Sequence, residues 1–307
     1  LHSFPTRRSS DLYSWAASAG LLALFPIGWL LAHLPAAVGL AVGRRLGDVL
    51  WWLLPRRRAM ALDNLRRSFG AERSGADLRR LGRRSFQHVG MNLVEICRYV
   101  LRPTDVMLSR VRLDGREHLE AAAAHGRGVL ILTAHYGNWE LLAAAHGLSG
   151  LPLSIVTRPL DHPLLDELAI RFRRRSGAEL ITKRRAVREV VAALRRQRMV
   201  GILLDQNATR AEGVFVPFFG APASTSKGLA LLALRTGAPV VPVFLRREPD
   251  GRHCMEAGPA LPPPADGLVT TYTTTFNQVL EAAIRRAPEQ WLWMHDRWRT
   301  RPRETAR

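Results

Sequence analysis

Apolar residues recur with two different spacings along this chain. Between residues 59 and 102, apolar residues recur every three or four positions, and arginines occupy the other faces. This spacing predicts amphipathic helices over Ala59–Phe69 and Leu78–Tyr99. From residue 128 onward, short apolar runs are separated by helix-like stretches. This change in the spacing of apolar residues predicts a basic helical layer followed by a region that contains a sheet.

The second half of the chain predicts strands that alternate with helices. Four apolar runs have the length of buried strands, Gly128–Ala134, Leu153–Thr157, Met199–Leu204 and Val240–Leu245. The expected helices are Glu140–Gly147, Pro163–Ser176, Arg184–Arg196, Ser226–Thr236 and Thr271–Arg286. Apolar strands with helices between them favour an α/β fold whose sheet is covered on both faces. With 307 residues, the chain can form one large α/β domain or two small ones.

The longest uncharged segment lies near the N-terminus. Ala16–Val42 contains no acidic residue, lysine or arginine, and about 20 such residues can cross a bilayer. Pro26 and Pro35 interrupt it, so a kinked span, a re-entrant hairpin and a helix in the membrane interface all remain open. A buried helix of a soluble domain is the alternative. The arginines that follow favour a membrane-attached protein whose remaining chain lies on the cytoplasmic side.

The net positive charge of the chain indicates which classes of partner it is suited to bind. The chain has 45 Lys+Arg against 26 Asp+Glu and a formal net charge of +19. This surplus favours anionic partners such as membrane lipid, a phosphorylated substrate or an acidic carrier protein. Nucleic acid is disfavoured, because neither paired zinc ligands nor a ribonucleoprotein-type aromatic motif is evident. Cys97 and Cys254 lack metal-type spacing, so we expect no structural metal and a cytosolic setting.

The first twelve residues look foreign to the rest. They read like the translation of a sequencing-adapter oligonucleotide, and we exclude them from fold arguments, as a fusion scar would be excluded. The expected division is a non-native leader at residues 1–12, a hydrophobic membrane-attachment segment at 13–55 and a main domain at 56–307.

The most informative motif is His-Tyr-Gly-Asn-Trp-Glu at residues 135–140. A histidine can take a proton from a hydroxyl near neutral pH, and a carboxylate can orient it. His135 and Glu140 can meet only if the histidine precedes the helix, because residues five apart on a helix point about 140° away from each other. Gly137 and Asn138 suit such a turn. Asn138 is also a candidate for substrate binding, and we expect His135 and Glu140 to be catalytic.

Other polar residues follow the later strands. Arg158 comes directly after one strand and could bind phosphate or stabilise an oxyanion. Asp205 and Gln206 come after another, and this acid–amide pair could hold substrate hydroxyls or orient a catalytic group. A surface arginine and a capping aspartate are the alternatives.

Two further segments are candidates for substrate binding. Gly213–Gly220 contains three aromatic residues, among them Phe218, which could form a wall for an acyl chain, although aromatic runs usually belong to a core. Lys227 stands where a helix is expected to begin, after Ser-Thr-Ser, which suits an anion such as phosphate. Ordinary helix capping explains that segment equally well.

Taken together, the ordered motifs resemble the family of lipid A biosynthesis acyltransferases, a branch of the lysophospholipid acyltransferase superfamily. The resemblance covers residues 15–303. The motifs that carry it are Arg57–Leu65, Asn92–Glu95, Thr133–Glu140, Arg158–Asp166, Asp205–Gln206, Val214–Gly220, Ala233–Phe244 and Pro288–Pro302.

The resemblance implies a glycerolipid acyltransferase-like domain with a central mixed sheet, a cofactor-free reaction and a location at the bacterial inner membrane. It implies that His135 is the general base with Glu140 as its partner, that Arg158 contacts a lipid phosphate or oxyanion, and that Asp205 helps to build the pocket. The expected reaction moves a fatty acyl group, of lauroyl or myristoyl type, from acyl-carrier protein to a lipid A precursor. Acyl-CoA as donor and another acceptor, such as a phosphatidylinositol mannoside, form the alternative.

Overall fold

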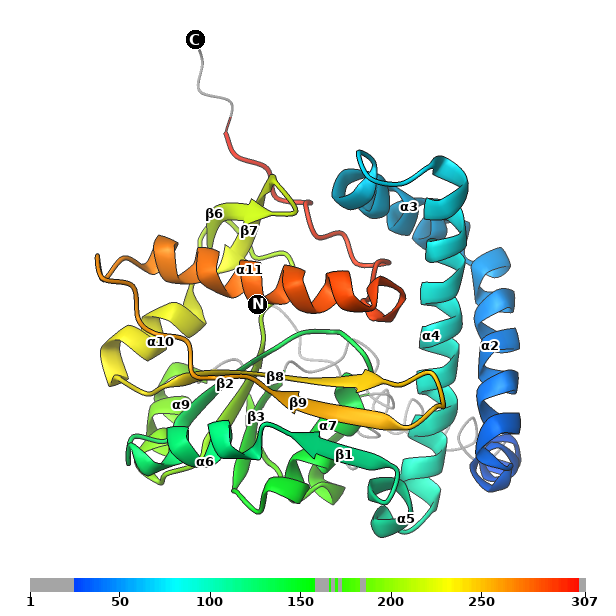
Figure 1. Ribbon diagram of the computed structural model, residues 1–307, viewed down its shortest axis with the longest axis horizontal. Coiled ribbons are helices and arrows are strands. Elements are labelled where there is room, and N and C mark those ends of the chain that lie inside the picture. Colours follow the sequence, from blue (N-terminus) through cyan, green and yellow to red (C-terminus); the bar gives the residue numbers. More distant parts are fainter. Residues whose placement is uncertain (1–24, 158–165, 167–168, 171–172, 183–185, 304–307) are drawn as a thin grey trace, which may run out of the picture.

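A mixed sheet forms the centre of the molecule. The computed structural model describes residues 25–157, 166, 169–170, 173–182 and 186–303 (Figure 1). Within this part of the chain, seven strands pair in the order β1-β9-β8-β2-β5-β3-β4. Their bounds are Val111–Asp114 (β1), Val129–Thr133 (β2), Leu153–Thr157 (β3), Glu179–Thr182 (β4), Met199–Leu203 (β5), Val240–Arg247 (β8) and His253–Ala257 (β9). Only the β8–β9 pair is antiparallel among these pairings.

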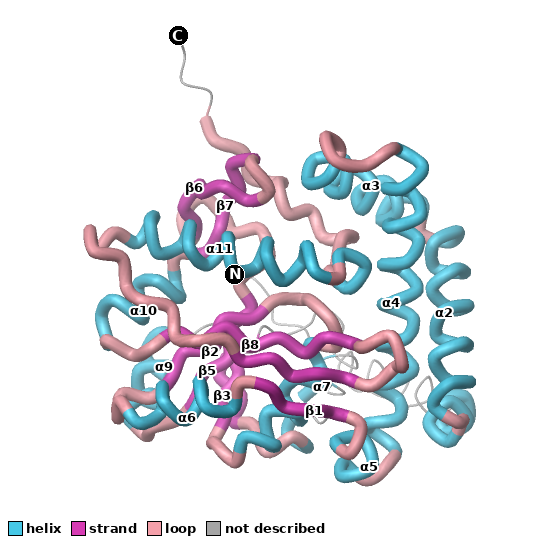
Figure 2. The backbone as a smooth tube through the Cα atoms, in the orientation of Figure 1, coloured by secondary structure: helices cyan, strands magenta, loops and turns pink. Residues whose placement is uncertain are grey.

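Helices cover both faces of this sheet (Figure 2). One face carries α5 (Thr104–Leu108), α6 (Arg116–Ala124) and α7 (Trp139–Ala145), and the other carries α9 (Ala186–Arg195), α10 (Gly228–Thr236) and α11 (Val269–Arg286). Alternate residues of β2 pack into the hydrophobic cores on the two faces of the sheet, because successive side chains of a strand point to opposite faces. Ile131 belongs to the core under α7, and Leu132 belongs to the core under α10 and α11.

The expected α/β fold is therefore confirmed, and the four predicted strands end within two residues of the observed ones. The pattern missed β1, β4 and β9. Each is short and carries charged or polar side chains. β1 and β4 lie at the edges of the sheet, where such side chains are common, whereas β9 lies between β1 and β8 and includes His253 and Glu256. It also missed the hairpin of β6 (Gly213–Phe218) and β7 (Ala221–Ser226). The helix expected over residues 163–176 falls largely outside the described residues.

The N-terminal layer consists of α2 (Ala36–Leu53), α3 (Pro55–Phe69) and α4 (Gly75–Leu101). α2 and α4 lie side by side at one end of the sheet (Figure 1). Glycines permit this close approach: a Cβ atom on Gly43 would stand 2.6 Å from Met91 Cα, and one on Gly47 would stand 2.3 Å from Gln87 Cα. The inner face of α2 thus packs within the protein, as in the buried-helix alternative.

The outer face of α2 remains apolar and exposed, with Val49 50%, Trp52 68% and Leu53 69% accessible. None of the helices in the described part of the chain is both long and apolar enough to span a membrane. Residues 25–33 are also helical, and α2 follows a break at Leu34 and Pro35. The proposed leader and the first part of the apolar segment lie outside the described residues.

Candidate active site

The loop after β2 carries His135 at the carboxyl edge of the sheet. Its path requires a glycine at residue 137, where φ is +60° and a Cβ atom would stand 1.7 Å from Leu245 O. Backbone hydrogen bonds fix both ends of the turn, because Leu292 N donates to His135 O at 3.0 Å and Asn138 N donates to Leu245 O at 3.1 Å. His135 therefore precedes α7 rather than lying on it, as the sequence predicted.

Asp205 holds His135 from the end of the neighbouring strand β5. Its Oδ1 lies 2.9 Å from His135 Nδ1, and its Oδ2 accepts the His135 backbone N–H at 3.0 Å. Trp291 Nε1 donates to the same Oδ2 at 2.8 Å. Asp205 is only 2% exposed, so its orientation is fixed on three sides. The aspartate orients a histidine, which was one of its two predicted roles.

His135 and Asp205 each stabilise the charged form of the other. Burial lowers the pKa of His135, but the charge of Asp205 and their hydrogen bond outweigh it, and the pKa lies above the ordinary 6.5. Burial raises the pKa of Asp205, but His135 and Trp291 outweigh it, and that pKa lies below the ordinary value. A carboxylate at Nδ1 favours the tautomer with the proton on Nδ1 and leaves Nε2 as an acceptor.

His135 Nε2 faces the more open side of the site. Gln206, whose side chain is exposed, places Nε2 3.3 Å from His135 Nε2. The amide thus occupies the position in which a substrate hydroxyl would donate its proton. The structure therefore brings three of the predicted residues, His135, Asp205 and Gln206, into one group.

Glu140 has a different partner from the one expected. Its carboxylate accepts two hydrogen bonds from Arg173, at 2.7 Å and 3.1 Å. Its charge still raises the pKa of His135, but less than Asp205 does. The expected direct pairing of Glu140 with His135 is replaced by His135–Asp205, because Glu140 lies in the first turn of α7, beyond the loop.

A buried polar network supports the loop from behind. Asn138 is 1% exposed; its Oδ1 accepts from Leu141 N at 3.1 Å and caps α7, while its Nδ2 donates to Glu95 Oε2 at 2.6 Å. Glu95 in turn accepts from Arg247, at 2.7 Å and 2.8 Å. Both polar atoms of Asn138 are therefore used inside the fold, which assigns this residue to the loop rather than to substrate.

Two more side chains of α4 reach the same loop. Asn92 Nδ2 lies 2.8 Å from Gly137 O, and His88 Nε2 lies 3.1 Å from it. Burial, with the charge of Arg247, lowers the pKa of His88 to about 3. Burial raises the pKa of Glu95, but Arg247 and His253 outweigh it and bring that pKa to about 2. The segment Asn92–Glu95 is one of the motifs that carry the family resemblance, but its sequence predicted no role for it; two polar residues at helical spacing were its only signal.

The remaining predicted residues lie elsewhere. Arg158 is outside the described residues. Phe218 is 0% exposed and lies in the core, where its ring packs on Trp291 and under the buried guanidinium of Arg297. Lys227 precedes α10 and forms no hydrogen bond or ion pair with His135, Asp205 or Glu140. Neither Phe218 nor Lys227 joins the group around His135.

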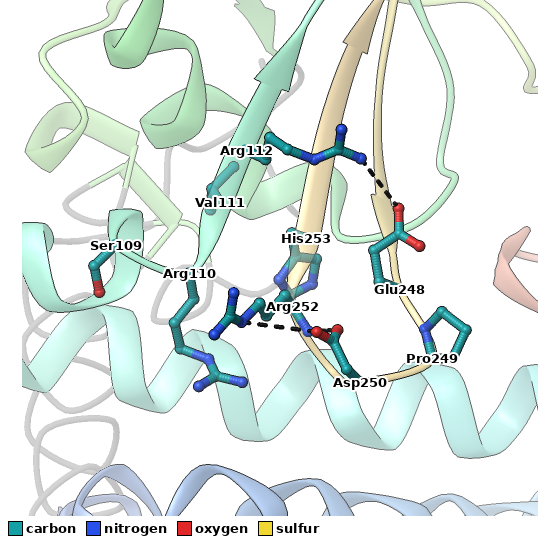
Figure 3. Close-up of a pocket in the computed structure, with 9 residues that line it drawn as sticks. All are labelled: Ser109, Arg110, Val111, Arg112, Glu248, Pro249, Asp250, Arg252 and His253. Carbon is teal, nitrogen blue, oxygen red and sulfur yellow. Dashed lines mark hydrogen bonds and ion pairs between the residues drawn. The ribbon is translucent and has the colours of Figure 1, made fainter.

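Two hollows stand out in the part of the chain that the structure describes. The larger one, about 810 Å³ including open solvent, lies between β1 and the β8–β9 turn (Figure 3). Ion pairs Arg112–Glu248 and Arg252–Asp250 line it. The smaller one, about 400 Å³ including open solvent, lies between α7 and the sheet and is lined mainly by apolar side chains. Only the apolar hollow borders the loop of His135.

A histidine at a strand end, oriented through Nδ1 and with Nε2 next to an exposed amide, has a geometry that suits acid–base chemistry. The profile of the family described as bacterial lipid A biosynthesis acyltransferase matches residues 7–300. The chain belongs to this family.

Known relatives agree with the family assignment. The chain is 32% identical over 277 residues to the lipid A biosynthesis lauroyltransferase of Escherichia coli (strain K12), which covers 89% of each protein. It is 30% identical over 280 residues to the lipid A biosynthesis palmitoleoyltransferase of the same organism, again with 89% of each covered. The phosphatidylinositol mannoside acyltransferase of Mycobacterium tuberculosis (strain CDC 1551 / Oshkosh) is 30% identical over 199 residues, 62% of this chain and 60% of that protein. The protein is thus an acyltransferase.

Proposed function

We propose that this protein transfers a fatty acyl group from an acyl-carrier-protein thioester to a hydroxyl of a lipid A precursor, with His135 as general base. The observation that carries the proposal is the orientation of His135, whose Nδ1 is held by buried Asp205 and whose Nε2 faces Gln206. The names of the two Escherichia coli relatives support the acceptor class.

The reaction needs no covalent enzyme intermediate. His135 Nε2 accepts the proton of the acceptor hydroxyl as its oxygen attacks the thioester carbonyl carbon. The new C–O bond forms, the C–S bond breaks, and the thiolate takes the proton back from His135. Asp205 stabilises the imidazolium that exists between the two proton transfers, because its carboxylate stays hydrogen-bonded to Nδ1.

The test uses the full chain in purified membranes, a lipid A precursor and acyl-carrier-protein thioesters of graded length, with mass spectrometry of the product. We expect a mass gain of one acyl group that falls by about 10²–10⁴-fold in His135→Ala. His125→Ala, at an exposed histidine on α6's C-terminal end, is the matched control and retains activity. An active His135→Ala protein would contradict the mechanism.

A second acceptor follows from the mycobacterial relative, whose name specifies phosphatidylinositol mannoside. Offering that glycolipid and acyl-CoA in parallel reactions separates the two functions. Transfer to the mannoside alone, or from acyl-CoA alone, would replace the lipid A proposal.

We also propose that the outer face of α2 rests on the cytoplasmic surface of the bacterial inner membrane. Trp52, Leu53 and Val49 are exposed there, and the guanidinium of Arg58 lies 5.8 Å from the ring centroid of Trp52. Arg45 and Arg56, close by in the sequence, are exposed as well. Apolar side chains flanked by arginines suit an anionic interface. In vesicle flotation, Trp52→Glu should release the protein from anionic vesicles, whereas Val187→Glu on α9, an exposed apolar residue elsewhere, should not. Equal binding of both variants would argue against this surface.

A further inference from the structure

The hollow between β1 and the β8–β9 turn is large enough to hold a ligand. About 440 Å³ of it is available to small groups, and small-molecule sites typically measure about 300–1,000 Å³. Its lining comes from residues 109–112 at the start of β1 and from residues 248–250, 252 and 253 at the β8–β9 turn (Figure 3). His135, Asp205 and Gln206 do not line it, so the hollow is separate from the candidate active site.

Two of the charged side chains in the lining already have strong partners. Arg112 forms an ion pair with Asp114 at 2.7 Å. Glu248 accepts two hydrogen bonds from Arg246, at 2.9 Å and 3.2 Å. Arg112 and Glu248 therefore add no uncompensated charge to the hollow.

The other charged side chains of the lining leave a surplus of positive charge. Arg252 Nε lies 3.7 Å from Asp250 Oδ2, which is too long for a hydrogen bond. The guanidinium of Arg110 has neither a hydrogen bond nor an ion pair within the described part of the chain. Figure 3 shows the side chains of Arg110 and Arg252 on the same side of the hollow. Two guanidinium groups against one carboxylate favour an anionic ligand.

Two further arginines lie close to Arg110. Arg98 is 8% exposed; it donates a hydrogen bond to Leu34 O and has no ion pair among the described residues. Burial lowers the pKa of the Arg98 guanidinium, and the charges of Arg102 and Arg110 lower it further, while Glu95 raises it. Like charges that lie this close repel one another, and an anion placed among them stabilises them.

The hollow also adjoins the surface that we propose to rest on the membrane. A Cβ atom on Gly251, in the β8–β9 turn, would stand 2.5 Å from Leu40 Cδ1 of α2. The helical residues before α2 expose large apolar side chains, and these are Phe25 54%, Ile27 56%, Trp29 51% and Leu30 57%. Excess positive charge near exposed apolar side chains suits the level of a membrane at which lipid phosphates lie.

We propose that this hollow binds a phosphate group, held by Arg110 and Arg252, and that an anionic phospholipid headgroup supplies it. A planar guanidinium donates two parallel hydrogen bonds to phosphate oxygens, so two arginines can hold one headgroup. Inorganic phosphate has the same chemistry, but only a lipid can also contact the exposed apolar side chains of residues 25–33. The choice of a headgroup rests on the proposed membrane surface, whereas the phosphate site rests on the arginines.

The test is native mass spectrometry of the purified full chain, released from a neutral detergent and titrated with two probes. The probes are short-chain phosphatidylglycerol, which needs no bilayer, and inorganic phosphate. We expect one phosphatidylglycerol to bind, with at least about tenfold lower affinity in Arg110→Gln, because charge-assisted hydrogen bonds to the phosphate are lost. Arg110→Lys keeps the charge but not the planar fork, so its loss should be smaller.

The matched control is Arg188→Gln. Arg188 is exposed and lies on α9, outside the lining of the hollow. We expect this variant, which also removes one positive charge, to bind phosphatidylglycerol as the unmodified protein does. An equal loss in Arg188→Gln and Arg110→Gln would show that only the net charge matters, and it would overturn the site.

The remaining outcomes decide between the ligands. Equal affinity of Arg110→Gln and the unmodified protein would overturn the site, and so would the absence of binding by either probe to the folded protein. Binding of inorganic phosphate alone, weakened in Arg110→Gln, would support the phosphate site and overturn the headgroup. If Arg110→Gln fails to fold, Arg252→Gln decides, because Arg252 is 70% exposed: lower affinity supports the site, and unchanged affinity overturns it. Acyl transfer is not measured, so none of these outcomes bears on the proposed reaction.

Discussion

Two carboxylates flank the candidate base, and their surroundings differ. Asp205 is 2% exposed and binds both the ring and the backbone of His135. Glu140 is close in sequence, partly exposed, and paired with Arg173. Asp205 comes from another strand, 70 residues away. The difference teaches that a strand end in a parallel sheet brings distant residues closer to a histidine than the helix that follows it.

The largest effect in this comparison is expected for Asp205→Asn. The amide keeps the shape but loses the charge that stabilises the imidazolium, so kcat should fall by about 10²-fold or more. Steady-state kinetics with the preferred thioester measures this loss. A kcat near that of the unmodified protein would show that Asp205 only fills space.

The second largest effect is expected on the free energy of unfolding, through the buried Glu95–Arg247 ion pair behind the His135 loop. Arg247→Met leaves Glu95 buried without its cation, and breaking such a pair costs about 3–5 kcal/mol. Chemical denaturation of the purified protein measures this free energy of unfolding. Arg196→Met is the control, because Arg196 and Glu179 are 53% and 43% exposed, and such an exposed pair is worth about 1 kcal/mol or less. Equal losses in both variants would contradict the difference in burial.

A smaller change is expected for Glu140→Gln. Glu140 affects His135 only through its charge, and its carboxylate is hydrogen-bonded to Arg173. We therefore expect kcat to fall by less than about tenfold. Comparing this variant with Asp205→Asn under the same conditions ranks the two acids. If Glu140→Gln loses more activity, then Glu140 moves to His135 in the substrate complex, and our ranking of the pair is wrong.

The smallest effect is a shift in pH dependence. Protonated His135 cannot accept a proton, so kcat/KM should fall as the pH drops through its pKa, which Asp205 raises above the ordinary value. Asp205→Asn removes that charge, so the acidic limb of the residual activity should move to lower pH. A pH profile of kcat/KM in both proteins tests the sign, and an unmoved limb would exclude His135 as the titrating group.

Local pattern was sufficient for much of the fold. β2, β3, β5 and β8 are buried and apolar enough to be recognised without their neighbours. Edge strand β1 was not, because its alternating charged residues resemble a loop. The aromatic segment of β6 allowed either a wall for an acyl chain or part of a core. Pairing with β7 and packing against α11 place Phe218 in the core.

The candidate site divides in the same way. The sequence by itself determined that His135 and Asp205 each follow a strand, because each strand is recognisable from the apolar run directly before that residue. Only the tertiary structure decided that Asp205 reaches His135, that Glu140 pairs with Arg173, and that Asn138 faces Glu95. The physical reason is that side-chain partners depend on strand order and register, which arise from contacts between residues far apart in the chain.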